Sequence, residues 1–159
     1  MTTNISAAAA GLTWAFIEWQ QHGAPTVLGI VTGAVAGLVS ITPACGFVGP
    51  LSAIAIGILG GILSYLAVTA LKPKAGYDDS LDVFGVHGIG GIWGTLATGL
   101  FAQEAVNETG SNGLFFGNSA LFLIQGLYLL VCLAYAAAMT WMLFILVDGL
   151  LLSLIHISE

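Results

Sequence analysis

Five apolar stretches, separated by short polar breaks, constrain this chain more than any other feature of its sequence. They cover residues 5–19, 25–41, 48–71, 82–102 and 114–150. Hydrophobic residues make up 58% of the 159 residues and charged residues only 6%, whereas a soluble domain carries about 25% charged residues. A helix needs roughly 20 mainly apolar residues to cross a bilayer. The sequence therefore predicts an all-α membrane protein, a polytopic transmembrane helix bundle of about five spans.

The polar breaks between these stretches predict how the spans are connected. They are short, so neighbouring helices are expected to be antiparallel. Both lysines lie in the break 72–80, which the excess of basic residues in cytoplasmic loops assigns to the cytoplasm. The break 20–23 and the C-terminus then lie on the same side, and 42–49 and 103–112 lie outside. The first stretch is short for a span, and the fifth is long enough for an interfacial turn or a tilt.

Glycines recur along three of the stretches. Gly29, Gly33 and Gly37 follow one another at intervals of four residues and so share one helix face. Small residues let helix backbones approach closely in lipid, where hydrophobicity alone gives no reason to associate. The glycines at 57, 60 and 61, and those between 85 and 94, extend the pattern. We therefore expect a compact bundle of several helices.

One histidine lies inside a glycine-rich apolar run, Asp82-Val-Phe-Gly-Val-His87-Gly-Ile-Gly-Gly-Ile-Trp-Gly94. A titratable ring within a membrane span is paired, hydrated through a cavity, or part of a conduction path. The glycines around it would let a neighbouring helix or a small solute come close. The functional interpretation is a narrow passage with one polar contact in its wall. The alternative is a packed histidine that hydrogen-bonds a neighbouring helix.

The other polar residues have simpler interpretations. Asp82 is expected to cap the helix that carries His87, because a carboxylate satisfies free amides at a helix N-terminus. Asp78 and Asp79 just before it read as a solvated loop pair. Thr32 and Thr42 either bond back to their own helix backbone or line a cavity, Thr42 within a turn that contains Pro and Gly.

Composition and missing motifs exclude several classes of function. The net charge is −6 with two basic residues, which argues against nucleic acid as a partner. The spans offer no phosphate-binding loop, no catalytic triad and no metal-ligand set, so we expect no enzyme, no metal and no cofactor. Two alternatives remain open: a structural helix bundle, and a haem-binding membrane subunit with His87 as axial ligand. The haem site would need a second histidine at matching depth, and His22 lies near the surface.

Two segments together resemble the ammonium transporter family (Amt, related to Rhesus proteins). They are Gly29-x-x-Thr-Gly-Ala-Val-Ala-Gly-Leu-Val-x-x-Thr-Pro-Ala-Cys-Gly46 and Asp82-Val-Phe-Gly-Val-His87, and the resemblance runs in order over residues 4–150. It implies an eleven-span fold, three subunits to an assembly, and two facing pore histidines. It also implies that ammonium is recruited at an outer vestibule, loses a proton and crosses as ammonia.

The resemblance also implies roles for single residues. His87 corresponds to the second of the twin pore histidines. Five other positions match residues of the family's pore or of its histidine-bearing helix. They are Val83 and Phe84 beside the narrow pore, Thr32 as a pore-side hydroxyl, Thr42 in the Thr-Pro-Ala motif, and Asp82 at the start of the helix.

Measured against that family, the chain corresponds to spans seven to eleven, without the first six spans and the other pore histidine. We therefore expect residues 1–151 to be a partial transporter domain, and the fragment to be inactive alone while its parent conducts ammonium or ammonia. Residues 152–159, Leu-Ser-Leu-Ile-His-Ile-Ser-Glu, resemble the translation of a transposase sequencing adaptor and are expected to be an artefact. The expected setting is a multi-pass protein of the cell membrane, in a bacterial inner membrane. Its expected partners are the lipid bilayer, two further copies in a homotrimer, and a cytoplasmic regulatory protein.

Overall fold

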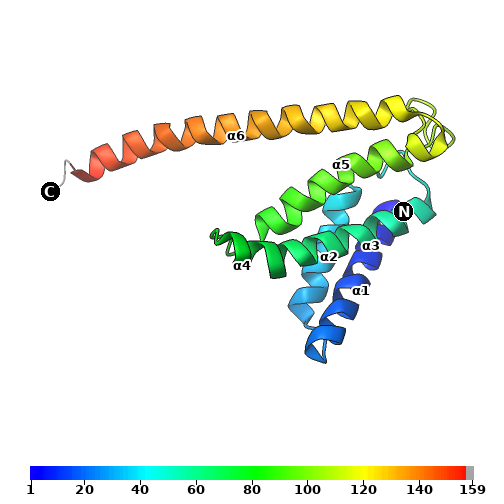
Figure 1. Cartoon of the computed structure of the whole chain (residues 1–159), viewed down its shortest axis with the longest axis horizontal. Coiled ribbons are helices and arrows are strands. Elements are labelled where there is room, and N and C mark those ends of the chain that lie inside the picture. Colours follow the sequence, from blue (N-terminus) through cyan, green and yellow to red (C-terminus); the bar gives the residue numbers. More distant parts are fainter. Residues whose placement is uncertain (157–159) are drawn as a thin grey trace. The chain divides into compact units, whose positions relative to one another are not determined.

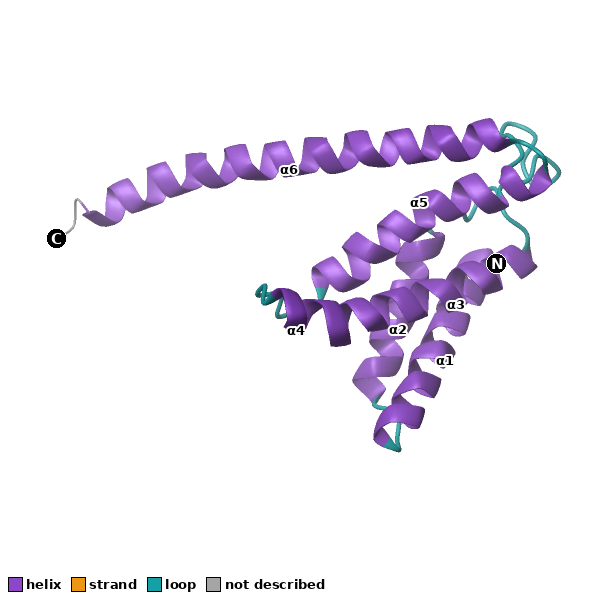
Figure 2. Cartoon of the chain, in the orientation of Figure 1, coloured by secondary structure: helices purple, strands orange, loops and turns teal. Residues whose placement is uncertain are grey.

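The computed structural model describes residues 1–156, with side chains through residue 150, and within that part the regular structure is all helical (Figure 2). This confirms the predicted all-α class. The helices are α1 (Thr2–His22), α2 (Val27–Ile41), α3 (Pro50–Leu66), η1 (Ala67–Leu71), α4 (Lys72–Ala75), η2 (Phe84–Gly88), α5 (Ile89–Phe101), η3 (Leu114–Phe116) and α6 (Ser119–His156).

Two of these helical segments are long and apolar enough to cross a membrane. They are Pro50–Ala75, which joins α3, η1 and α4, and Ser119–Leu150 within α6. The segment Val27–Ile41 is apolar but shorter. Helices also cover the other two predicted stretches, so the expected pattern of helices is present.

The chain divides into two units, residues 1–126 and the part of α6 from Leu127 onward. The second unit is apolar around its whole circumference, as expected for a helix surrounded by lipid or protein. At 1.5 Å per residue, the 38 residues of α6 would extend about 57 Å, which exceeds a hydrocarbon core of about 30 Å. The turn expected in the fifth stretch lies before α6, at η3 and at Gly117, whose φ is 92°. The proposed boundary at residue 152 lies beyond the described side chains, and residues 157–159 lie outside the described residues.

Helices α1 and α2 form an antiparallel pair joined by a tight turn (Figure 1). Helix α1 is longer than the predicted stretch 5–19, because polar residues at both ends continue the helix. It ends at Gly23, whose φ of 81° is the left-handed conformation that often closes a helix. Helix α2 begins after Thr26, whose hydroxyl accepts a 2.9 Å hydrogen bond from the Gly29 amide.

Glycines bring α2 and α3 into backbone contact with α1. A Cβ at Gly37 or at Gly57 would collide with the carbonyl oxygen of Ser6, and one at Gly61 would lie 3.0 Å from that of Ala10. The Ser6 hydroxyl donates to the Gly37 carbonyl at 2.9 Å. Close helix contact at small residues, as predicted from the glycine spacing, is therefore confirmed.

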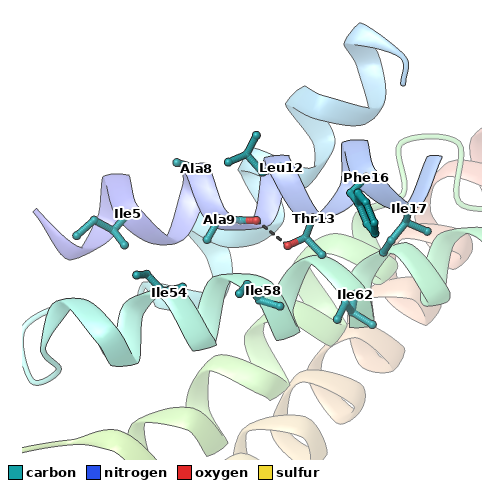
Figure 3. Close-up of a pocket in the computed structure, with 10 residues that line it drawn as sticks. All are labelled: Ile5, Ala8, Ala9, Leu12, Thr13, Phe16, Ile17, Ile54, Ile58 and Ile62. Atoms are coloured by element: carbon teal, nitrogen blue, oxygen red, sulfur yellow. Dashed lines mark hydrogen bonds between the residues drawn. The ribbon is translucent and has the colours of Figure 1, made fainter. Parts of the chain in front are cut away.

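An apolar hollow of about 890 Å³ runs between α1 and α3 (Figure 3). Of the ten side chains drawn there only Thr13 is polar, and its hydroxyl donates to the Ala9 carbonyl at 2.7 Å. The wall therefore presents hydrocarbon and no unpaired side-chain hydroxyl, as a surface within lipid or against another apolar helix requires. The lining residues are Ile5, Ala8, Ala9, Leu12, Thr13, Phe16, Ile17, Ile54, Ile58 and Ile62.

The third helical segment continues further than the sequence predicted. The sequence placed Lys72 and Lys74 in a polar break, but both lie in the helix, which ends at Gly76 with a φ of 67°. A proline normally clashes with the preceding turn of an α-helix. Here η1 is π-helical, and the Lys72 amide donates to the Ala67 carbonyl five residues back. This wider turn accommodates Pro73 without ending the helix.

Helix α5 packs against both α2 and α3. The indole of Trp93 donates to the Ile56 carbonyl at 3.0 Å, and a Cβ at Gly94 would collide with the Ser40 carbonyl oxygen. The buried core at this junction consists of Ile41, Ala44, Val48, Ala53, Ile56 and Ala97. These contacts hold the histidine-bearing segment against the other helices.

Candidate functional site

The predicted pore residues of the fourth stretch lie at its start, where the helix is π-helical. His87 lies in η2 and its side chain is exposed on the surface of the first unit. Val83 is 50% exposed and Phe84 is 46% exposed. Residues four or five apart lie on nearly the same face of a π-helix, because its backbone hydrogen bonds join residues five apart. Val83 and His87 therefore share an exposed face, and no side-chain hydrogen bond within the described residues involves the imidazole.

The opposite side of η2 is held by close packing. A Cβ at Gly85 would lie 2.7 Å from a methyl of Val68 and 3.6 Å from the Cβ of Ala67, so η2 lies directly on η1. The Phe84 ring lies over Gly88, and it meets the Tyr77 ring edge to face at 5.6 Å. The packing on this side of η2 therefore supports the segment whose exposed face carries Val83 and His87.

Asp79, rather than Asp82, caps the helix that carries His87. Its carboxylate accepts the Val83 amide at Oδ1 and the Phe84 amide at Oδ2, both at 2.8 Å. The sequence assigned this capping to Asp82, which is wrong. Asp78 and Asp79 do lie in the loop before the helix, as expected, but the Asp79 carboxylate binds these two amides. A carboxylate at this position satisfies two free amides and lies at the favourable end of the helix dipole.

Asp82 instead forms an ion pair. Its Oδ1 lies 2.8 Å from the Nζ of Lys72, and the two side chains are 29% and 28% exposed. The Lys72 ammonium also donates to the main-chain carbonyl of Asp79. Asp82 has a φ of 54°, the left-handed conformation that Asp tolerates better than most residues. Asp82 therefore keeps a structural position at the start of the helix, through its backbone and its ion pair.

A polar cavity of about 190 Å³ lies where the ends of α1, α2 and α3 meet the loop before η2. Thr32 and Asp82, two of the predicted site residues, both line it. The hydroxyls of Thr42, Thr69 and Thr95 each donate to a carbonyl of the preceding turn. Among the side-chain hydrogen bonds of the described residues, none involves the Thr32 hydroxyl. Thr32 thus lines the cavity and, among the described residues, its hydroxyl does not make the bond to its own helix that these other threonines make. The wall consists of Trp14, Glu18, His22, Thr26, Leu28, Gly29, Thr32, Tyr65, Val68, Thr69 and Asp82.

The Glu18 carboxylate forms another part of this wall. It accepts the Thr26 amide at 2.7 Å, the Thr26 hydroxyl at 3.1 Å and the Trp14 indole N–H at 3.2 Å. The oxygens of Glu18 would also collide with a Cβ at Gly29. Glu18 therefore ties the end of α1 to the start of α2.

Thr42 lies apart from this cavity, at the C-terminal end of α2. Its hydroxyl donates to the Leu38 carbonyl at 2.7 Å and the side chain is exposed. Ten residues of α-helix separate it from Thr32, a rise of about 15 Å. The structure thus groups Val83, Phe84 and His87 on one segment and Thr32 with Asp82 in one cavity, while Thr42 occupies the other end of α2.

Two residues that hold the histidine-bearing helix, Asp79 and Lys72, were not predicted from the sequence. A capping residue normally stands immediately before the first helical residue, which here is Val83, so the sequence pattern favoured Asp82. Asp79 stands four positions before Val83 and reaches the free amides because of the turn between Asp79 and Asp82. The sequence placed Lys72 in the polar break that follows the third apolar stretch, so its ion pair with Asp82 was not predicted.

An all-α membrane protein with an exposed histidine on a glycine-rich helix is the class that these observations define. A profile described as the Ammonium Transporter Family matches residues 1–159. The chain belongs to the ammonium transporter family, whose members are transporters rather than enzymes.

Individual relatives agree with this assignment. The chain is 54% identical over 121 residues to an ammonium transporter of Bacillus subtilis, covering 76% of this chain and 30% of that protein. It is 47% identical over 149 residues to the ammonium transporter Amt1 of Archaeoglobus fulgidus, covering 94% and 37%. The crystal structure of Saccharomyces cerevisiae Mep2 superposes with a TM-score of 0.87 at 36% identity, covering 92% of this chain and 34% of that one. The chain thus spans about a third of the length of these relatives.

Proposed function

We propose that this chain forms part of the pore wall of a protein that conducts ammonium or ammonia across a membrane, with His87 as the polar contact in the pore. The observation that carries the proposal is the position of His87. It belongs to an apolar helical segment, yet its own bundle leaves the ring exposed and without a hydrogen-bond partner among the described side chains. A titratable ring within a membrane requires a partner, water or a pathway to face.

The chemistry of an imidazole suits this substrate. A cation in an apolar passage carries a large desolvation penalty, and loss of its proton removes most of that penalty. The neutral ring offers one hydrogen-bond donor and one acceptor to the small polar molecule that remains. Val83 and Phe84, exposed beside His87, would form the apolar part of the same wall.

The polar cavity supports a role at the inner end of the pathway. Thr32 would contribute its free hydroxyl there, and Asp82 would fix the start of the histidine-bearing helix. Thr42 would line the pathway at the opposite end of α2. The lysines at 72 and 74 support a cytoplasmic location for the cavity end.

In the whole protein, the pore would need residues that lie outside this chain. A second imidazole would come from the portion of the relatives' length that this chain does not cover, so the chain alone would not conduct. Membership in a multi-pass membrane family supports the lipid bilayer as its environment. We extend the proposal to a homotrimer in a bacterial inner membrane, with a regulatory protein on the cytoplasmic side.

A chimera tests the function directly. The matching third of the Bacillus subtilis ammonium transporter is replaced by residues 1–150 of this chain, and methylammonium uptake is measured in cells that lack their own transporter. We expect uptake by the chimera and none above background by the chain alone. His87→Ala and His87→Leu should each lower uptake about tenfold or more, since loss of one polar contact of about 1.4 kcal/mol corresponds to a factor of ten.

Asp78→Asn serves as the control, because Asp78 is exposed in the loop before the helix. Uptake by this variant should equal that of the unmodified chimera, with equal amounts of protein in the membrane. If both His87 variants transported as fast as this control, the assigned role of the histidine would be lost. A chimera that is present in the membrane but transports nothing would contradict the proposed function of the segment.

A further inference from the structure

We propose that Lys72 is a positioning residue for His87, because its ammonium fixes the turn from which the histidine-bearing helix begins. Lys72 lies in the helix that ends before this turn and does not touch the exposed face of His87. It would therefore act through the two aspartates of the turn, Asp79 and Asp82. The role matters for transport only if the proposed function holds, but the arrangement can be measured without transport.

One ammonium, that of Lys72, contacts both ends of the turn. The Nζ of Lys72 donates to the main-chain carbonyl of Asp79 and, at 2.8 Å, to the carboxylate of Asp82. The Asp82 amide also donates to that carbonyl of Asp79, at 3.1 Å, which closes a turn of four residues. Lys72 therefore binds the first and the last residue of the same turn.

Asp82 has an unusual backbone conformation, which the contact with Lys72 helps to hold. Its φ of 54° is the one positive value at a non-glycine position among the described residues. Left-handed backbone is unfavourable for an L-residue and persists where surrounding contacts hold it. The charge-assisted bond to Lys72 is such a contact, and it directs the Asp82 side chain to the lysine while Asp79 takes the capping position.

Main-chain hydrogen bonds connect the turn to the segment that carries His87. The Asp82 carbonyl accepts the Val86 amide at 2.9 Å, and the Asp79 carboxylate accepts the amides of Val83 and Phe84. Three hydrogen bonds of the first turn, from the amides of residues 83, 84 and 86, thus depend on two residues that Lys72 contacts. His87 follows Val86 directly, so a shift of the turn would change the direction of the imidazole.

The packing behind η2 explains why the lysine is suitably placed. The π-helical segment η1 ends at Leu71, immediately before Lys72, and its Val68 contacts Gly85 of η2. Lys72 and the surface that supports η2 therefore belong to one continuous helical segment. An ammonium fixed to that segment ties the loop before η2 to the surface behind it.

The test uses this purified chain in lipid nanodiscs. In Lys72→Met we expect the amides of Val83 and Phe84 to exchange with deuterium about tenfold faster, the order expected when a charge-assisted bond is lost. Asp82→Asn should produce a similar acceleration, and the double variant Lys72→Met/Asp82→Asn should add little to either change, because both remove the same interaction.

The NMR resonance of the His87 imidazole provides a second measurement. A general loss of stability would not shift the His87 resonance alone. The ring Cε1–H resonance of His87, identified by its absence in His87→Gln, should shift in Lys72→Met while that of His22 stays unchanged. Lys72→Arg should restore both the resonance and the slow exchange, since a guanidinium can also donate to two acceptors. Lys74→Met is the matched control, because Lys74 is exposed on the same short helix and should change neither readout.

Two results would overturn the proposal. One is an unchanged exchange rate and an unchanged His87 resonance in Lys72→Met. The other is faster exchange that extends equally to Ile56 in the middle of α3 and is not restored by arginine, which would mean that Lys72 supports folding in general. A chimera that fails to transport would leave both readouts intact, so failure of the proposed function is distinguishable from failure of this inference.

Discussion

Asp79 and Asp82 lie three residues apart at the start of one helix, and the structure gives their carboxylates different partners. The Asp79 carboxylate accepts two main-chain amides, whereas that of Asp82 pairs with Lys72. Both bonds of Asp79 go to amides that would otherwise have no partner in the helix. At the scale of single residues, the conformation of the turn therefore decides which aspartate caps the helix that carries His87.

Because Asp79 caps the helix and its neighbour Asp78 does not, alanine at these two positions should change the free energy of unfolding unequally. Asp79→Ala should lower the free energy of unfolding by about 1 kcal/mol, the usual cost of losing a helix cap. Asp78→Ala should change it by less than about 0.5 kcal/mol, because that carboxylate is exposed and accepts only the nearby Ser80 hydroxyl, at 3.3 Å. Thermal unfolding of the chain in detergent micelles, followed by circular dichroism, measures both. Equal losses for the two variants would contradict the assigned cap.

At the scale of whole elements, glycines determine how closely the helices approach. Gly37 of α2 and Gly57 of α3 meet the same carbonyl of α1, that of Ser6. Gly91 of α5 has no atom within 4 Å of the position where a Cβ would stand. The glycines of this chain therefore differ in function: some permit backbone contact, and others are merely present in the same apolar stretches.

The same substitution should have opposite effects at two of these glycines. Gly37→Ala should lower the free energy of unfolding by about 1–3 kcal/mol, because the added methyl overpacks the contact with Ser6 and Ala10. Gly91→Ala should raise it by about 0.5–1 kcal/mol, since alanine restricts the unfolded chain more than glycine and nothing obstructs it. Unfolding titrations with a denaturing detergent, followed by tryptophan fluorescence, compare the two. A loss at position 91 as large as that at position 37 would refute this account.

At the scale of the whole molecule, the basic residues in the polar connections predict which side of the membrane each loop faces. The loop 76–82 follows a helix that ends with Lys72 and Lys74, and the break 103–112 between α5 and η3 has no basic residue. Basic residues are retained on the cytoplasmic side during insertion. If the spans alternate, we expect the turn that contains Cys45 to lie outside.

Labelling of single cysteines in the chimera tests that orientation. With Cys132 replaced by serine, the exposed Cys45 should react with a membrane-impermeant maleimide in intact cells. A variant with Cys45→Ser, Cys132→Ser and Ser80→Cys should react only in inverted vesicles, because loop 76–82 would face the cytoplasm. The reverse pattern would show that two lysines do not determine the orientation of this chain.

The sequence by itself determined the class of fold, since hydropathy, helix length and the spacing of glycines are local properties that survive in any arrangement of the spans. It also located the histidine and the motifs that resemble the ammonium transporter family, because these are contiguous in the chain. The tertiary structure decided that Asp79 caps the helix, that Asp82 pairs with Lys72, and that Thr32 shares a cavity with Asp82. Lys72 and Thr32 belong to other helices than the loop that contains Asp82, and the π-helical segment η1 leads directly to Lys72. Asp79 is close in sequence to the amides that it accepts, but the turn between Asp79 and Asp82 directs its carboxylate to them. Contacts of that kind depend on the three-dimensional path of the backbone, which no local pattern in the sequence specifies.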